Sequence, residues 1–185
     1  MIKKIIATSV LLTALCAGAF AQAPRIATVD LGQLFNSYWK VTESQAMFDD
    51  AVQKANEELE KMMAELQAAD EQVGQAFARA QNPALSESAR EAAQAEAMEK
   101  RQRLLEQEAE VNQYGQRTNQ NLSQQRQQII QGHLSEIRGI IREIAAEKGY
   151  DLVLNTDGGQ VVFAAEKFDI TASVKAVLNA DAPSN

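Results

Sequence analysis

The sequence predicts a mostly helical α+β fold, in which a long antiparallel helical coiled-coil hairpin stands on a small β-sheet body. From Phe48 to Ala80, apolar residues recur at steps of three and four, the spacing of a narrow seam along one side of an α-helix. Short runs rich in β-branched residues occupy the two ends of the mature chain instead, at residues 25–29 and 150–164. The seam comprises Phe48, Val52, Ala55, Leu59, Met62, Leu66, Ala69, Val73, Ala76 and Ala80.

Residues 1–21 read as a cleaved secretory signal peptide. Lys3 and Lys4 precede an apolar run that ends in a small-x-small site, Ala19-Phe20-Ala21. The run is about 16 residues long, shorter than the roughly 20 that a membrane span needs. The single cysteine, Cys16, lies inside it, so we expect a mature chain without disulfides or thiolate metal ligands.

The mature chain is acidic and poor in aromatic residues. Removing Lys3 and Lys4 leaves 16 basic residues against 25 acidic ones, a net charge of about −9. This balance argues against nucleic acid and anionic membranes as partners. Many apolar residues are alanines, which bury little area, so a compact core must come from the chain ends or from other copies.

Residues 22–40 are expected to form the first part of the body. Arg25 to Val29 reads as a strand, and Asp30 with Gln33 has the spacing of a capping box for a short helix at 31–37. Tyr38 and Trp39 follow, and we expect them to be buried at the joint with the long helix.

Residues 41–127 are expected to form the hairpin arm. Thr42 and Gln45 predict the start of its first helix, and Asn82-Pro83 predicts its end. With Ser88 as the next cap, the tip is predicted at 82–88. The second helix should run to Lys148, where Gly149 stops it.

Residues 128–180 are expected to complete the body, followed by a frayed tail at 181–185. The end of the second helix carries a broad apolar face that the first helix is too short to cover. Residues 150–155 and 160–164 read as a β-hairpin joined through Asp157-Gly158-Gly159, and a short helix is expected at 170–179. The candidates for the body and trimer core are Val29, Ile129, Ile130, Leu134, Ile137, Ile140, Ile141, Ile144, Leu152, Leu154, Val161 and Phe163.

The sequence predicts neither an enzyme nor a cofactor or metal site. No nucleophile stands beside a base in a recognisable pattern, and Gly158-Gly159 is a turn rather than a phosphate loop. The single histidine, His133, is interpreted as a residue on the helix surface or near a trimer contact, with a pH-sensing role as the alternative.

The two ends of the mature chain resemble the Skp/OmpH family of periplasmic chaperones. The resemblance is carried by Arg-Ile-Ala-Thr-Val-Asp-Leu-Gly-Gln-Leu-Phe at 25–35, by Tyr-Asp-Leu-Val-Leu-Asn at 150–155 and by Asp-Ile-Thr-Ala at 169–172. It implies a homotrimer in the periplasm, with hairpins that hang as tentacles around a cavity and hold unfolded outer-membrane proteins without ATP. Better-known members are basic, whereas this mature chain is acidic, so client binding should depend more on apolar and hydrogen-bonding contacts.

Two sets of residues are candidates for client binding. Flexible or aromatic side chains, Met47, Met63, Phe77 and Met98, can adapt to unlike partners, although they could equally fill gaps along the seam. Tyr114 and Leu122 lie in a stretch, 112–128, in which ten of 17 residues are Asn or Gln. That stretch could offer an unfolded client a polar surface without binding it tightly, or it could be a polar helix surface without a role.

A structural protein is the alternative from a different class. In this interpretation the chain is a coiled-coil scaffold or adaptor of the envelope, and the arm tips dock onto a partner protein.

Overall fold

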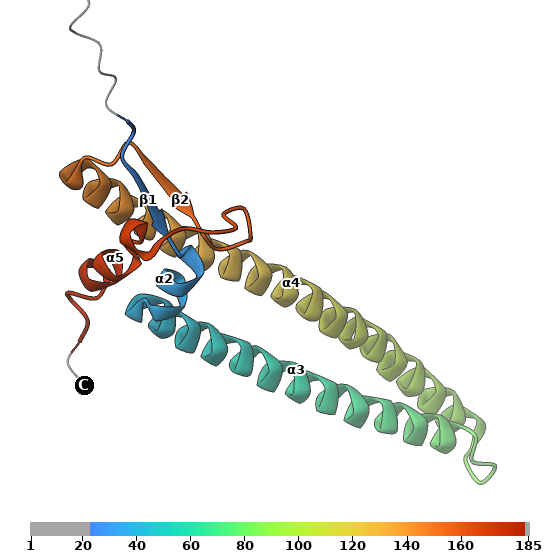
Figure 1. The fold of residues 1–185 in the computed structure, drawn as a ribbon. Coiled ribbons are helices and arrows are strands. Elements are labelled where there is room, and N and C mark those ends of the chain that lie inside the picture. Colours follow the sequence, from blue (N-terminus) through green and yellow to red (C-terminus); the bar gives the residue numbers. More distant parts are fainter. Residues whose placement is uncertain (1–22, 184–185) are drawn as a thin grey trace, which may run out of the picture.

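In the computed structural model, which describes residues 23–183, a long helical hairpin projects from a small body (Figure 1). The hairpin consists of α3 (Trp39–Ala80) and α4 (Glu87–Lys148). The body contains β1 (Ile26–Val29), α2 (Leu31–Ser37), β2 (Leu152–Asn155), the 3-10 helix η2 (Glu166–Phe168), α5 (Thr171–Leu178) and the end of α4. The predicted signal peptide, 1–21, lies outside the described residues.

The body sheet has two parallel strands, with Ile26 opposite Leu152 and Val29 opposite Asn155. The predicted β-hairpin of 150–155 and 160–164 is therefore wrong. Gly158 and Gly159 do adopt the positive φ angles of a turn, 91° and 75°. However, the Asn155 side chain ties this turn to α2, because its Oδ1 accepts from the backbone N–H groups of Leu31 and Asp157. The chain then continues to η2 without pairing along β2.

The body core gathers residues from both ends of the chain. Its buried members are Ala27, Val29, Leu34, Tyr38, Ile137, Ile141, Ile144, Ile170, Val174 and Leu178. The extra length of α4 supplies the three isoleucines of this set. The apolar face at the end of α4 is thus covered by β1, α2 and α5 rather than by the first helix of the arm, as the unequal helix lengths predicted.

The start of α3 differs from the prediction. Asp30 caps α2 as expected, accepting from the backbone N–H of Gln33 at 2.7 Å. The long helix α3, however, begins at Trp39 rather than near Thr42. Asn179, just after α5, accepts from the Trp39 backbone N–H at 3.0 Å and so satisfies one of its unpaired donors. A cap from 140 residues away leaves no local signal in the sequence.

On the α4 side, the tip of the hairpin ends two residues earlier than predicted. Ala80 ends α3, and Ser86, not Ser88, caps α4 by accepting from the Ala89 backbone N–H. Gly149 ends α4 as predicted, with a left-handed φ of 67°. At 1.5 Å per residue the two helices are about 63 and 93 Å long.

Candidate functional site: the arm and its joint with the body

The half of the arm nearer the tip is closed by small residues. Val73, Ala76 and Ala80 of α3 are buried, as are Ala93 and Ala97 of α4. Alanine lets two helices approach closely, and Figure 1 shows α3 and α4 converging toward the tip. The tip half is therefore the tightly packed part of the hairpin.

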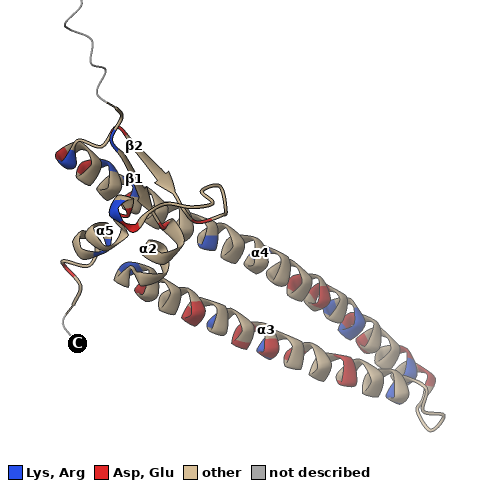
Figure 2. Ribbon diagram, viewed as in Figure 1, with Lys and Arg blue, Asp and Glu red and all other residues tan. Residues whose placement is uncertain are grey.

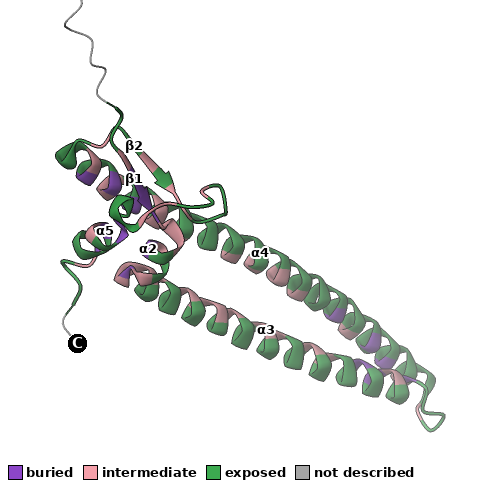
Figure 3. Ribbon diagram, in the orientation of Figure 1, coloured by how far each residue is buried: buried purple, intermediate pink, exposed green. Residues whose placement is uncertain are grey.

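The half nearer the body is open. The predicted seam continues there with larger residues, from Phe48 to Ala69, yet all of its positions are only partly buried. On α4, none of the described residues between Leu104 and Ile137 is buried. In Figure 3 the buried colour is confined to the tip region and the body, with a half-exposed stretch between them. Residues that would fill a core in a closed coiled coil are thus left available for other contacts.

The six candidate client-binding residues do not form a single patch. Met47, Met63 and Met98 are exposed at separate levels of the arm, with Met63 at 57%. Phe77 is half-buried near the tip, while Tyr114 and Leu122 are half-buried on the open part of α4. The open half also contains Phe48, Leu59 and Leu66, which were predicted only as seam residues.

The open half of α4 is nearly free of charge. Between Val111 and Ser135 the sequence has no acidic residue, and its arginines are Arg117 and Arg126. Figure 2 shows this stretch mostly in the neutral colour, whereas acidic residues recur along α3. The predicted amide-rich stretch is therefore mostly uncharged, and most of its residues are exposed to solvent.

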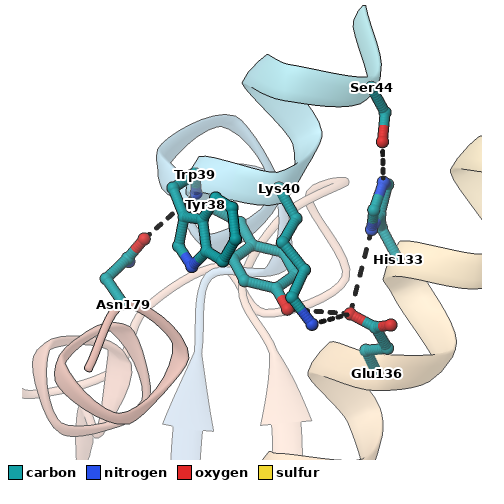
Figure 4. Close-up of polar contacts among 7 residues, drawn as sticks. All are labelled: Tyr38, Trp39, Lys40, Ser44, His133, Glu136 and Asn179. Carbon is teal, nitrogen blue, oxygen red and sulfur yellow. Dashed lines mark hydrogen bonds and ion pairs between the residues drawn. The ribbon is translucent and has the colours of Figure 1, made fainter. Parts of the chain in front are cut away.

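A polar cluster holds the base of the arm together (Figure 4). The buried Tyr38 hydroxyl donates to Glu136 Oε2 at 2.7 Å, and Lys40 Nζ lies 3.5 Å from the same oxygen. Burial and this hydrogen bond raise the pKa of Tyr38, and the same hydrogen bond lowers the pKa of Glu136. The cluster fixes the first turn of α3 to α4. Tyr38 was predicted at the joint, but Glu136 was not, because nothing distinguishes it from other surface glutamates in the sequence.

His133 belongs to this joint, so its interpretation as a surface residue is wrong. Its Nε2 lies 2.9 Å from Ser44 Oγ on α3, and the Tyr38 ring meets the imidazole edge-on at 5.7 Å. Its buried Nδ1 lies 3.9 Å from Glu136 Oε2 and has no hydrogen-bond partner among the described residues. The imidazole fills the space between the two helices where they leave the body.

Removing the charge of Glu136 should make the unfolding free energy depend less on pH in the acid range. The lowered pKa means that the ionised carboxylate stabilises the folded state above the unfolded-state pKa, and that this contribution is lost as the pH falls through the folded-state value. In Glu136→Gln, the loss of unfolding free energy relative to the wild type should be largest near pH 7 and shrink below about pH 4. Urea unfolding at several pH values measures it. Glu143→Gln, an exposed change on the same helix, is the control, and an equal loss at every pH would contradict the prediction.

The body exposes a second set of apolar side chains that the intrachain core does not use. Of the predicted body and trimer candidates, Val29, Ile137, Ile141 and Ile144 are buried, while Ile129, Leu134, Ile140 and Val161 are partly buried. The remaining four, Ile130, Leu152, Leu154 and Phe163, are exposed. Val162, which was not among the predicted candidates, is 96% exposed. The unbroken apolar run Val161-Val162-Phe163 after the glycine turn was the signal in the sequence that could have identified it.

Within residues 23–183 no cluster of His, Cys, Asp and Glu has the arrangement of a metal site. In the same part of the chain, no helix has both the length and the hydropathy to cross a membrane.

Comparison with known proteins places this architecture in a family. The sequence profile of the OmpH-like outer membrane proteins matches residues 25–178. No curated protein matches the chain significantly. Among solved structures, the chain is similar to the crystal structure of a candidate OmpH-like outer membrane chaperone from Caulobacter crescentus CB15, with a TM-score of 0.65 and 18% identity over 88% of this chain and 89% of that one. Because the family match spans nearly all of the described residues, the chain belongs to the OmpH-like outer membrane protein family.

Proposed function

We propose that this protein is an ATP-independent holdase chaperone of the periplasm, which binds unfolded outer-membrane proteins between helical arms and prevents their aggregation. Membership of the OmpH-like family supports the chaperone class, and the solved relative with the same fold bears that description. The predicted signal peptide supports export to the periplasm.

The open half of the arm is the observation that carries the proposal. Phe48, Leu59 and Leu66 of α3 and Tyr114 and Leu122 of α4 are only half-buried along a helix pair long enough to enclose a chain segment. Half-buried apolar side chains can cover the apolar stretches of an unfolded client, because they gain burial when it binds. The amide-rich face of α4 beside them can donate to and accept from a client backbone. Because such contacts are individually weak, the client can be released without ATP.

A homotrimer completes the proposed cavity. The exposed apolar set of the body, Ile130, Leu152, Leu154, Val162 and Phe163, supports self-association, because exposed apolar surface on a folded protein commonly marks an interaction site. Three bodies joined through this set would bring three arms around one space.

The scaffold alternative finds less support in the tip. Residues 81–84 are exposed and polar or small, and Leu85 is only half-buried, so the tip offers little apolar surface for a partner protein.

Aggregation of a denatured outer-membrane β-barrel, followed by light scattering, tests the proposal. The purified mature protein should suppress aggregation at stoichiometric amounts, with no effect of added ATP. The double variant Leu59→Ser/Leu66→Ser should suppress it less, since both changes remove apolar surface from the open half. Val177→Ser, an exposed change on α5 of the body, is the control. Absence of suppression by the wild type at every ratio would contradict the holdase function.

A further inference from the structure

One flank of the arm carries an apolar groove with an acidic rim. Its volume is about 600 Å³, and its floor is formed by Met63 and Leu66 of α3 and Leu104 of α4. Three carboxylates stand around this floor: Glu60 and Asp70 of α3 and Glu108 of α4. The other lining residues, an alanine and a glutamine, are uncharged, so the groove contains no positive charge.

The rim carboxylates are not neutralised within the chain. Among residues 23–183, Glu60, Asp70 and Glu108 form no ion pair and accept no side-chain hydrogen bond. Some other acidic residues of the arm are paired with cations on their own helix, such as Asp50 with Lys54 and Glu58 with Lys61. The rim charges therefore act on whatever occupies the groove.

The opposite flank of the arm is different in charge. The hollow on that side is lined by Glu65 of α3 together with Lys100 and Arg103 of α4. Both cations also lie close to glutamates of their own helix, Lys100 to Glu96 and Arg103 to Glu99. Of these two flanks, only the one with the groove is lined by carboxylates without cations.

The net negative charge of α3 adds to the electrostatic potential that the rim carboxylates create. From Glu43 to Glu71, α3 carries nine acidic residues and two lysines, a net charge of −7, and all nine acidic residues are exposed. Most of the net charge of the mature chain, about −9, thus lies on α3, the helix that forms one wall of the groove. A second copy of this helix, an anionic lipid surface and an acidic peptide would each be repelled.

We propose that this groove binds segments of unfolded protein that are both apolar and positively charged. Apolar client side chains would cover Met63 and Leu66, and a lysine or arginine of the client would lie against the rim carboxylates. The inference rests on the proposed holdase function and names the class of client segment that the arm prefers. From Glu60 to Asp70 the helix rises about 15 Å, the length of four or five extended residues. Two or three apolar side chains and one or two cations can therefore lie in the groove together.

Three synthetic peptides test the inference. Each is a fluorescently labelled ten-residue segment with the same leucines and serines, and they differ only in carrying three lysines, three glutamines or three glutamates. Binding to the full mature protein is measured by fluorescence anisotropy at low and high salt. The groove variant is Glu60→Gln/Asp70→Asn/Glu108→Gln. The control variant, Glu58→Gln/Glu65→Gln/Glu106→Gln, removes the same charge from residues that do not line the groove.

The lysine peptide should bind the wild type about fivefold more tightly than the glutamine peptide, and the glutamate peptide should bind most weakly. This preference should fall as salt rises, because the rim is exposed to solvent. It should fall to about twofold or less in the groove variant, in which only the remaining charge of α3 favours the cationic peptide, and persist in the control variant. Equal affinities for the lysine and glutamate peptides, or an equal loss of preference in both variants, would overturn the inference.

Failure of this inference is distinguishable from failure of the holdase proposal. If the wild type suppresses barrel aggregation but binds the lysine and glutamate peptides alike, the groove has no charge preference and the holdase function stands. If the wild type does not suppress aggregation, the holdase function fails whatever the peptides show.

Discussion

Replacing Ile137 by aspartate is expected to unfold the body of the protein. Ile137 has no exposed surface and lies in the core that joins α4 to β1, α2 and α5. A carboxylate there has no partner, and burying it without one costs several kcal/mol, a large part of the roughly 5–15 kcal/mol that stabilises an ordinary domain. We therefore expect Ile137→Asp to lose the urea transition of the body.

The matched control is Ile137→Val, which removes one methylene and should cost only about 0.5–1.5 kcal/mol. Circular dichroism with urea titration measures both variants, and mass in solution reports assembly. Loss of the intrachain core should also prevent the proposed trimer, because the strand and loop surfaces would no longer be held in place. A urea midpoint for Ile137→Asp within error of the wild type would show that the core assigned here is wrong.

Phe163→Asp should instead abolish self-association and leave the chain folded. The Phe163 side chain is 86% exposed in one chain, so its replacement removes little intrachain burial and should change the unfolding free energy of the monomer by no more than about 0.5 kcal/mol. In a trimer joined through the exposed apolar set, the same change places a carboxylate in an apolar contact. The mass in solution should fall from three chains to one.

Gln160→Asp, in the same loop, is the control for added charge, and it should keep the wild-type mass. A wild type that is itself a monomer would contradict the trimer proposal. An unchanged trimer mass for Phe163→Asp would move the interface away from this loop while leaving trimerisation intact.

Local signals in the sequence were enough for the hairpin. The seam spacing, the break at Asn82-Pro83 and the stop at Gly149 are each determined by neighbours within a few residues, and α3 and α4 follow them closely. The cap by Asp30 was predictable for the same reason. Patterns of this kind are reliable because the interactions that they report are short-range in the chain.

The body could not be predicted to the same degree, because its contacts are distant in sequence. The turn at Gly158-Gly159 has the chemistry of a hairpin, yet β2 pairs with β1, about 126 residues earlier. The joint likewise depends on Tyr38 meeting Glu136, and the start of α3 depends on Asn179. The acidic groove was also missed, since it appears only when two helices with separate sequence patterns are placed side by side.

The parallel pairing of β1 with β2 also fixes the order in which the chain can fold. The hairpin can close from its tip as soon as both helices exist, because each new contact there joins residues already near one another. The body must wait until Leu152 and then α5 have been made, since its sheet and core unite the first and last segments of the chain. Until then the isoleucines at the end of α4 lack the cover that α5 provides. Before its body is complete, this protein therefore exposes apolar surface of the kind that we propose its clients expose.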